Sequence, residues 1–452
     1  MHLYTKKILL PTLLSLLAIA CKTKSTGQDS TSTQPIDSIP IHIDYTPLDA
    51  TQSNKYRHII QSFYDTIISK KLNGQMLVAK NGTILFEQYI GAERLDNPSS
   101  APMNAHSSVH LASVSKTFTA GAILLLQQQG KLTINDLVTQ YLPTFPYPTV
   151  TIKMLLNHRA GLPNYVHALP SWGYKSTAMA TNQDVLNYMI LGKAPLLYKP
   201  DTKFSYCNTN YAMLALVIEQ VSGVSYPVYL KNNIFLPLNM QDTYVFTPAD
   251  LPTAIPSYER TKPFLYMNLD GVYGDKNIYS TVKDLYKWDQ ALYTNKLINA
   301  ESKQLTYTPY SNEKPGVKNY GLGWRMFNFE NGRKIIFHNG WWHGNNNAFI
   351  RLVQDSATII CLGNKFSKTN YSVLQLSYLF GDYPFEYEVE EGKDTSKAAE
   401  INMLSQLKLR ADSLKKAPAT KPKKDIILIP KKDSLNLPKP KPTLPTKQDT
   451  ME

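Results

Sequence analysis

The 452-residue chain is poor in the residues that build disulfide frameworks and metal sites. It has 3 cysteines and 9 histidines, and neither C-x-x-C nor H-E-x-x-H occurs. We therefore expect no metal, and a metallohydrolase is disfavoured. One cysteine, Cys21, lies near the N-terminus, which leaves Cys207 and Cys361 in the body of the chain. Two isolated cysteines predict no structural disulfide.

Other absences narrow the function. No G-x-S-x-G elbow occurs, which disfavours an α/β-hydrolase. The net charge of +13 is concentrated at the ends: residues 1–24 contribute +4, and residues 393–452 contribute +7, which leaves the middle near neutral at about +2. A nucleic-acid-binding domain would carry a basic face on its folded part, so we expect no nucleic-acid partner.

The N-terminal apolar run, Ile8–Ala20, is too short to span a bilayer comfortably. With the lysines before it, it has the form of a secretory signal over residues 1–20. The segment LLAIAC resembles the end of a bacterial lipoprotein signal, in which Cys21 becomes the lipidated first residue of the mature chain. The alternative is an ordinary signal peptide that is cleaved nearby, with no role for Cys21. Residues 21–49 are rich in Ser, Thr, Asp and Pro and predict a flexible tether.

Residues 50–390 predict an α/β sandwich. An amphipathic pattern over 56–71 indicates a helix, and Asn81-Gly82 and Asn331-Gly332 each join two β-type runs in the manner of a hairpin. Strand patterns lie at both ends of this region, while helical patterns fill 113 to about 300. We expect one antiparallel sheet built from both ends, with a helical subdomain inserted between them and the site in the cleft between the two.

The end of the chain has a different composition. Residues 391–452 are rich in lysine and proline, apart from one candidate amphipathic helix over 396–416, and predict a disordered tail. A tail that contacts anionic envelope polymers is the alternative.

The stretch around Ser113 is the first candidate for chemistry. Ser113 and Lys116 are one turn apart at the start of a helical pattern that Gly130 closes, so the lysine amine can reach the serine hydroxyl. A neighbouring base that removes the hydroxyl proton makes serine a nucleophile. The motif S-x-x-K is weak evidence by itself, because it begins at five serines: Ser113, Ser280, Ser311, Ser405 and Ser413.

Two further stretches lie on the helical side. In LLNHRAGLPNY, His158 is predicted to be a hydrogen-bonded structural histidine. In Y-x-N, Tyr206 could act as a general base or proton shuttle, and Asn208 could donate a hydrogen bond to a substrate carbonyl. A helix cap with a packed aromatic is the simpler interpretation of Y-x-N. The second S-x-x-K is explained by Ser280 or Thr281 acting as the N-cap of a helix.

A fourth stretch, HNGW from His338 to Trp341, ends a predicted strand and contains the only H-x-G of the chain. Gly340 would let a substrate backbone approach closely, and the backbone N–H of Trp341 could form an oxyanion hole with that of Ser113. A turn after an edge strand is the alternative.

Together these motifs occur in one order: S-x-x-K, L-x-x-H-x-x-G-L-P, Y-x-N, S-T-x-x-D-L, Y-G-L-G-W and H-x-G. Over about 56–385 the chain resembles the serine β-lactamases and penicillin-recognising hydrolases, on the side that includes class C β-lactamases, D,D-carboxypeptidases, D-aminopeptidases and related esterases. The resemblance implies an α/β sandwich and a mechanism without a cofactor.

By this resemblance Ser113 forms an acyl-enzyme, Lys116 and Tyr206 move the proton, and Asn208 orients the substrate amide. His338 stands where better-known members carry the lysine of K-T-G, with Gly340 as the matching glycine. A histidine there is expected to be a weaker, pH-dependent cation, which puts efficient β-lactam hydrolysis in doubt. Trp341 and its neighbour Trp342 are expected to form an aromatic wall for an acyl group.

Our hypothesis is an exported serine hydrolase, anchored to a membrane of the bacterial envelope and facing the periplasm, that cleaves an ester or amide. A D-amino-acid peptide or peptidoglycan fragment is preferred over a β-lactam as substrate, and peptidoglycan is a candidate partner. The alternative is a non-catalytic cell-wall or ligand-binding module on the same fold.

Overall fold

The computed structural model describes residues 45–384, and the elements below lie in that range. The predicted signal peptide, Cys21, the tether up to residue 44 and the tail from 391 lie outside it. The helices are α1 Ala50–Phe63, α2 Lys116–Gln128, α3 Ile152–Leu156, α4 Tyr165–Ala168, α5 Asn182–Leu191, α6 Asn208–Ser222, α7 Tyr226–Leu230, α8 Val282–Tyr293 and α9 Ala300–Thr306. The longer strands are β1 Gly74–Lys80, β2 Thr83–Ile90, β9 Arg325–Asn328, β10 Lys334–Trp342, β11 Asn345–Leu352 and β12 Ala357–Gly363. The shorter strands are β3 Val109–His110, β4 Tyr244–Val245, β5 Tyr258–Glu259, β6 Lys262–Pro263, β7 Ile278–Ser280 and β8 Lys318–Tyr320.

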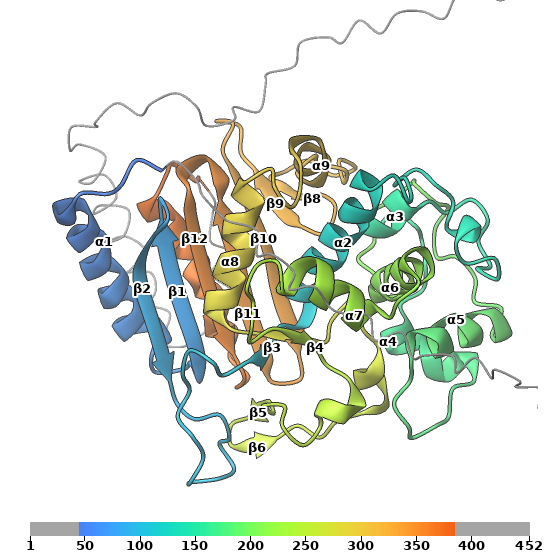
Figure 1. Ribbon diagram of the computed structural model, residues 1–452, viewed down its shortest axis with the longest axis horizontal. Coiled ribbons are helices and arrows are strands. Elements are labelled where there is room, and N and C mark those ends of the chain that lie inside the picture. Colours follow the sequence, from blue (N-terminus) through green and yellow to red (C-terminus); the bar gives the residue numbers. More distant parts are fainter. Residues whose placement is uncertain (1–44, 385–452) are drawn as a thin grey trace, which may run out of the picture. The chain divides into compact units, whose positions relative to one another are not determined.

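The main sheet is antiparallel and has the strand order β2-β1-β12-β11-β10-β9-β8 (Figure 1). The N-terminal hairpin β1–β2 therefore pairs directly with the C-terminal strand β12. The helices from α2 to α7 come from the sequence between β3 and β4. This arrangement confirms the predicted sheet from both chain ends with a helical insertion.

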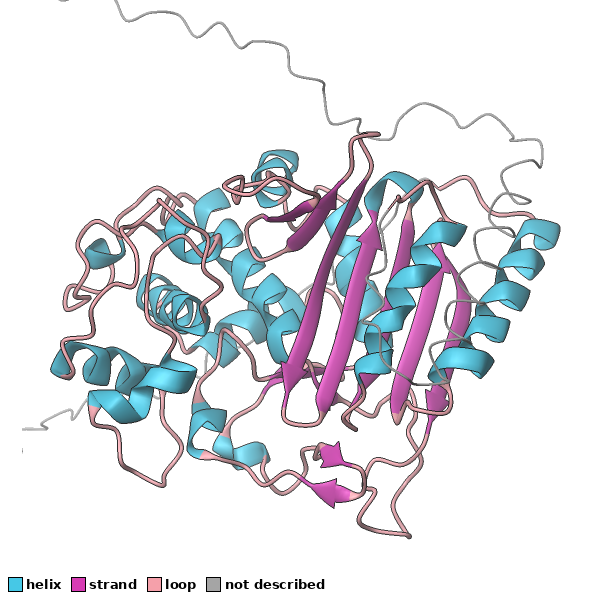
Figure 2. Cartoon of the chain, turned by 180° about the vertical axis from the view of Figure 1, so that it is seen from behind, coloured by secondary structure: helices cyan, strands magenta, loops and turns pink. Residues whose placement is uncertain are grey.

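The two faces of the sheet follow the two-residue period of its strands. On β1, Leu77 belongs to a core shared with α2, α6 and α8, whereas Val78 belongs to a second core shared with α1 and the segment 368–379. On β12, Ile360 and Ile359 divide in the same way. Helices thus cover both faces, which confirms the predicted α/β sandwich (Figure 2).

The two Asn-Gly hairpins differ in their turns. Asn81 and Gly82 both have positive φ, 48° and 73°, as a two-residue type I′ turn requires. Between β9 and β10 the turn is longer: the Phe329 N–H donates to the Arg333 carbonyl at 2.9 Å, and only Gly332 has a positive φ. The prediction of a hairpin at Asn331-Gly332 is right for the strand pairing and wrong for the turn, because Glu330 belongs to the turn and Phe329 pairs with Arg333 instead.

Local helix signals also agree with the structure. The predicted helix over 56–71 is α1, extended by one wider turn, Tyr64–Ile68. Helix α8 begins after Thr281, whose Oγ1 accepts a hydrogen bond from the Asp284 N–H at 3.2 Å, so the N-cap is Thr281 rather than Ser280.

None of the helices described between residues 45 and 384 is by itself long and apolar enough to cross a membrane. Helix α6 and the segment Tyr226–Phe235 pass that test only as a pair, with a bend of 75° between them.

Candidate active site

Ser113 lies in a tight connection between β3 and α2. It belongs to a 3₁₀ turn, Ala112–Ser115, and helix α2 begins directly afterwards at Lys116. The residue before it, Ala112, has a φ of 50°, which costs a non-glycine residue about 1–3 kcal/mol. The Ala112 N–H donates to His110 Nδ1 at 3.1 Å, which helps to hold this turn in place. The serine is half-buried.

Lys116 is fully buried and its amine has three hydrogen-bond partners. Nζ lies 3.0 Å from Ser113 Oγ, 2.8 Å from Asn208 Oδ1 and 2.8 Å from the Asp275 carbonyl oxygen. The last two oxygens can only accept, whereas a serine hydroxyl can accept or donate. Lys116 Nζ donates to all three oxygens, and the Ser113 hydroxyl is the one partner that could in turn pass a proton to the amine. This is the geometry of a base beside a nucleophile.

Tyr206 lies over this amine, in the loop before α6. Its ring centroid is 5.0 Å from Lys116 Nζ, 4.7 Å from Arg325 Cζ and 4.4 Å from the centroid of the His158 ring. Within the described residues the Tyr206 hydroxyl makes no hydrogen bond to the protein. The structure thus brings together Ser113, Lys116, Tyr206 and Asn208, four residues that the sequence analysis selected from separate stretches.

His158 supports the loop that carries Tyr206. Its side chain is fully buried, and Nδ1 accepts the Cys207 N–H at 3.2 Å, while its backbone carbonyl accepts the Ser205 N–H at 2.9 Å. Burial, with Lys116 and Arg325 adding to it, lowers the pKa of His158 well below the usual value for histidine. A neutral ring that holds backbone groups matches the structural role expected from the sequence.

Arg325, at the start of β9, is a residue that the sequence analysis missed. Its guanidinium stacks against Tyr206 and lies 6.0 Å from the centroid of the Tyr320 ring. The side chain is half-buried, and no carboxylate of residues 45–384 forms an ion pair with it. The only signal in the sequence was a basic residue directly after Y-G-L-G-W.

His338 corrects the expectation of a pH-dependent cation. The side chain is fully buried; Nδ1 donates to the Asn339 carbonyl at 2.7 Å, and Nε2 accepts from the Tyr320 hydroxyl at 3.1 Å. Both ring nitrogens are therefore satisfied in a neutral ring. Burial, reinforced by the charges of Arg325 and Lys116, lowers the pKa of His338 well below its usual value. His338 supplies no positive charge here, and its direct contact with substrate stays a prediction that this burial disfavours.

Gly340 brings the edge of the sheet against the nucleophile turn. Pairing between β9 and β10 stops at Phe337, so the following part of β10 faces the turn that carries Ser113. A Cβ on Gly340 would run into the Leu111 carbonyl oxygen and lie 3.1 Å from Ala112 Cβ. This contact within the protein requires a glycine at position 340, whereas the prediction from the sequence explained the glycine by the close approach of a substrate.

The side chains after Gly340 differ in their surroundings. Trp341 is 63% exposed and its ring centroid is 6.1 Å from that of Phe366. Trp342 instead turns inward, where its Nε1 donates to Asp270 Oδ1 at 2.6 Å. Of the two tryptophans Trp341 is the exposed one, and the aromatic wall stays a prediction.

The two cysteines of the described body are free and buried, one in each hydrophobic core. Burial raises the pKa of Cys207 to about 11 and that of Cys361 to about 12. Both are therefore unreactive thiols at neutral pH. Across residues 45–384 no group of three or more His, Cys, Asp or Glu side chains is arranged to hold a metal ion.

The comparison with known proteins agrees with this geometry. A family model described as "Beta-lactamase" matches residues 66–372. The chain belongs to the β-lactamase family. It is 33% identical to Penicillin-binding protein 4* of Bacillus subtilis over 378 residues, which is 78% of this chain and 81% of that protein. The match to the family model and this relative together identify the chain as a serine hydrolase.

Solved structures share the fold. A penicillin-binding protein from Bacillus halodurans matches with a TM-score of 0.62 at 24% identity, over 72% of this chain and 99% of that one. D-amino acid amidase from Ochrobactrum anthropi SV3 matches with a TM-score of 0.59 at 18% identity, over 81% and 100% of the two chains. At these identities the likeness establishes the β-lactamase fold alone.

Proposed function

We propose that this serine hydrolase cleaves an amide or ester bond next to a free carboxylate, as at the end of a D-amino-acid peptide or a peptidoglycan fragment. The observation that supports this proposal is the guanidinium of Arg325, which has no ion-pair partner among the described residues and lies beside Tyr206. A planar guanidinium binds a carboxylate through two parallel hydrogen bonds. A substrate carboxylate held there would place the neighbouring carbonyl near Ser113.

The chemistry then follows from the amine of Lys116. Ser113 Oγ attacks the substrate carbonyl while Lys116 Nζ takes the hydroxyl proton, and the amide or ester bond breaks to leave an acyl-enzyme. Lys116 and Tyr206 return the proton to the leaving group. Water, with Tyr206 as base, releases the acyl group from Ser113 and restores the hydroxyl.

Two further groups would hold the substrate. Asn208 accepts from Lys116 through Oδ1, so its Nδ2 remains as a donor toward the substrate amide. The backbone N–H groups of Ser113 and Trp341 would form the oxyanion hole, and the packing of Gly340 on Leu111 supports this arrangement.

A β-lactam is the less favoured substrate, because the family's usual lysine of K-T-G is replaced by His338, which is buried and neutral. A non-catalytic binding module is also less favoured. Burial of Lys116 against Ser113 costs desolvation energy and yields nothing for ligand binding, whereas it is required for activation of the serine.

We propose further that the enzyme is exported and lipid-anchored through Cys21 on a membrane of the bacterial envelope. The basis is the sequence alone: the charged start, the short apolar run and LLAIAC before the cysteine. Metabolic labelling with a fatty-acid analogue tests this proposal. Labelling of the wild type that disappears in Cys21→Ala supports the anchor, and labelling that persists in the variant contradicts it.

A panel of matched compounds tests the proposed reaction. An N-acetylated D-Ala-D-Ala peptide, its C-terminal amide, an L-Ala-L-Ala peptide and benzylpenicillin would be incubated with the enzyme and with Ser113→Ala. We expect hydrolysis of the first compound to exceed that of the other three, and no hydrolysis by the variant. Equal rates for the acid and the amide would contradict the carboxylate requirement.

A further inference from the structure

Three consecutive polar residues of the loop before β7 are buried, and the catalytic scheme above uses only a backbone atom of one of them. Asp275, Lys276 and Asn277 are 1%, 2% and 1% exposed. Asp and Lys are rarely buried so completely unless their charges are paired. No local pattern indicates this burial, since G-D-K-N has the composition of an ordinary surface turn.

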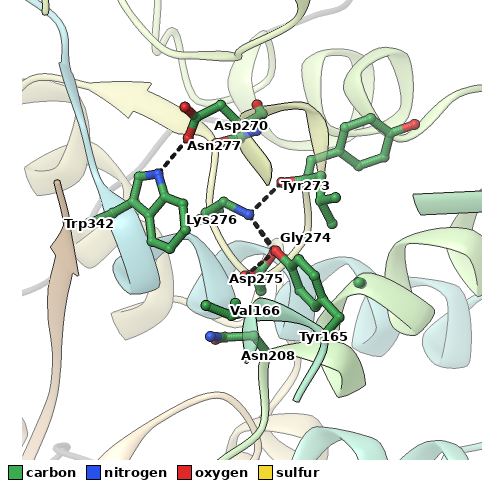
Figure 3. Close-up of polar contacts among 12 residues, drawn as sticks. Tyr165, Val166, Asn208, Asp270, Tyr273, Gly274, Asp275, Lys276, Asn277 and Trp342 are labelled. Carbon is green, nitrogen blue, oxygen red and sulfur yellow. Dashed lines mark hydrogen bonds and ion pairs between the residues drawn. The ribbon is translucent and has the colours of Figure 1, made fainter. Parts of the chain in front are cut away.

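The buried charges meet at Tyr165, the first residue of α4. The Tyr165 hydroxyl donates to both Asp275 carboxylate oxygens, at 3.2 and 3.1 Å, and accepts a short hydrogen bond from Lys276 Nζ (Figure 3). Lys276 Nζ also donates to the Val272 carbonyl at 3.1 Å and lies 3.6 Å from Asp275 Oδ1. Its ammonium is 4.8 Å from the centroid of the Trp342 ring. Tyr165, Asp275 and Lys276 are called the buried cluster below.

The backbone of this loop touches the catalytic helix. The Asp275 carbonyl accepts from Lys116 Nζ at 2.8 Å, and the Gly274 carbonyl accepts from Thr119 Oγ1 at 2.6 Å. Gly274 has a φ of 96°, and a Cβ there would run into the Tyr211 carbonyl oxygen, so the loop is pressed against α6. The loop thus provides one of the two obligate acceptors of the Lys116 amine.

Stability alone does not account for the buried cluster. Replacement of a buried ion pair by apolar residues of similar volume is often neutral or stabilising, because the desolvation penalty is large. Burial lowers the pKa of Lys276, the carboxylates of Asp275 and Asp270 raise it, and Lys116 lowers it further. The peptide group between Asp275 and Lys276 carries the carbonyl that accepts from Lys116. Because both side chains are fixed by hydrogen bonds to Tyr165, rotation of this peptide group is restricted.

We propose that the buried cluster positions the Asp275 carbonyl under the Lys116 amine, so that Lys116 faces Ser113 in the orientation that accepts its proton. Tyr165, Asp275 and Lys276 are positioning residues, since none of them touches the reacting atoms. This inference rests on the proposed Ser113–Lys116 chemistry and does not depend on the identity of the substrate.

The test measures the rate at which a fluorophosphonate phosphonylates Ser113 with loss of fluoride, followed by intact mass. The main variant is the double change Asp275→Asn with Lys276→Met, which removes both charges and leaves no unpaired charge in the interior. We expect it to fold with an unchanged circular dichroism spectrum and to react at least tenfold more slowly. In steady-state assays kcat should fall while KM changes little.

The matched control is Lys80→Met. Lys80 is a half-buried lysine that also donates to a backbone carbonyl, that of Asp355 at 2.7 Å, but it lies on β1, away from the Ser113 turn. Its rate of phosphonylation should equal that of the wild type. Tyr165→Phe, which removes only the shared hydroxyl, should slow phosphonylation less than the double variant does.

A pH profile separates positioning from general damage. The titratable groups around Lys276 are Asp275 in its own loop, Asp270, Tyr165 on α4, Lys116 on α2, and the histidines His110 and His343. Lys276→Met alone leaves the Asp275 carboxylate without its partner, so the peptide group that holds Lys116 is no longer fixed. The ascending limb of its pH–rate profile should therefore differ from that of the wild type, and Lys276→Arg should return the limb toward the wild-type position.

The outcomes are distinct. A folded double variant that reacts as fast as the wild type overturns the positioning role and leaves the proposed function intact. A pH profile of Lys276→Met that coincides with that of the wild type overturns it as well. Failure of the folded wild type to react with the probe overturns both the catalytic scheme and this inference.

Discussion

The change Arg325→Gln tests the substrate assignment most sharply. The guanidinium is half-buried and lies 4.7 Å from the centroid of the Tyr206 ring, with no carboxylate partner within residues 45–384. A hydrogen bond to a charged group contributes about 1.5–3 kcal/mol, and partial exposure to solvent places this one in the lower part of the range. We therefore expect kcat/KM for a D-Ala-D-Ala peptide with a free carboxylate to fall by about tenfold to thirtyfold.

The assay compares that peptide with its C-terminal amide. The amide has no charge for Arg325 to bind, so its kcat/KM should change by less than about twofold in Arg325→Gln. Arg57→Gln, which removes an exposed arginine from α1, serves as the matched control and should leave both substrates unchanged. A loss of equal size for the acid and the amide would refute carboxylate binding and would mean that Arg325 acts by holding the Tyr206 ring.

Three further predictions concern the fold around the site. Gly340→Ala should destabilise the protein by about 1–3 kcal/mol in denaturant unfolding and lower activity, since its Cβ would push β10 away from Leu111; full activity would contradict this packing. Thr281→Ala should cost about 1 kcal/mol and leave kcat unchanged, because Thr281 caps α8; an unchanged unfolding midpoint would show that the cap is dispensable. Burial lowers the pKa of His110 to about 4, below that of an unfolded histidine at about 6.5, so the unfolded chain binds the proton first and stability falls on acidification. Between pH 7 and pH 5 this histidine should account for about 2 kcal/mol of lost stability, and His110→Gln should lose correspondingly less over that range.

The fold was largely predictable because its determinants are local. The short apolar run ATIICLG and the Asn81-Gly82 turn indicate a buried strand and a hairpin without reference to the rest of the chain. The spacing of Ser113 and Lys116 predicted their contact, since residues three apart share one side of a helical turn. The order of the motifs then predicted Tyr206 and Asn208 in the same site, and in the structure both contact Lys116.

The parts that sequence reasoning missed depend on tertiary contacts. Arg325 meets Tyr206 only because β9 lies beside β10 and its first residue faces the loop before α6. His338 has the spacing of a substrate-binding cation, yet the Tyr320 hydroxyl and the surrounding core make it a buried neutral ring. The burial of Asp275 and Lys276 likewise has no local signal, because it arises from a tyrosine more than a hundred residues earlier in the chain.

The most direct test of the account is an intact-mass spectrum of the soluble protein from residue 25 after exposure to a fluorophosphonate, alongside Ser113→Ala and Lys116→Met. Lys116 Nζ lies 3.0 Å from Ser113 Oγ, so we predict a single adduct on the wild type, none on Ser113→Ala and strongly slowed labelling of Lys116→Met. An adduct that persists in Ser113→Ala, or labelling of Lys116→Met at the wild-type rate, would contradict the claim that this lysine activates this serine.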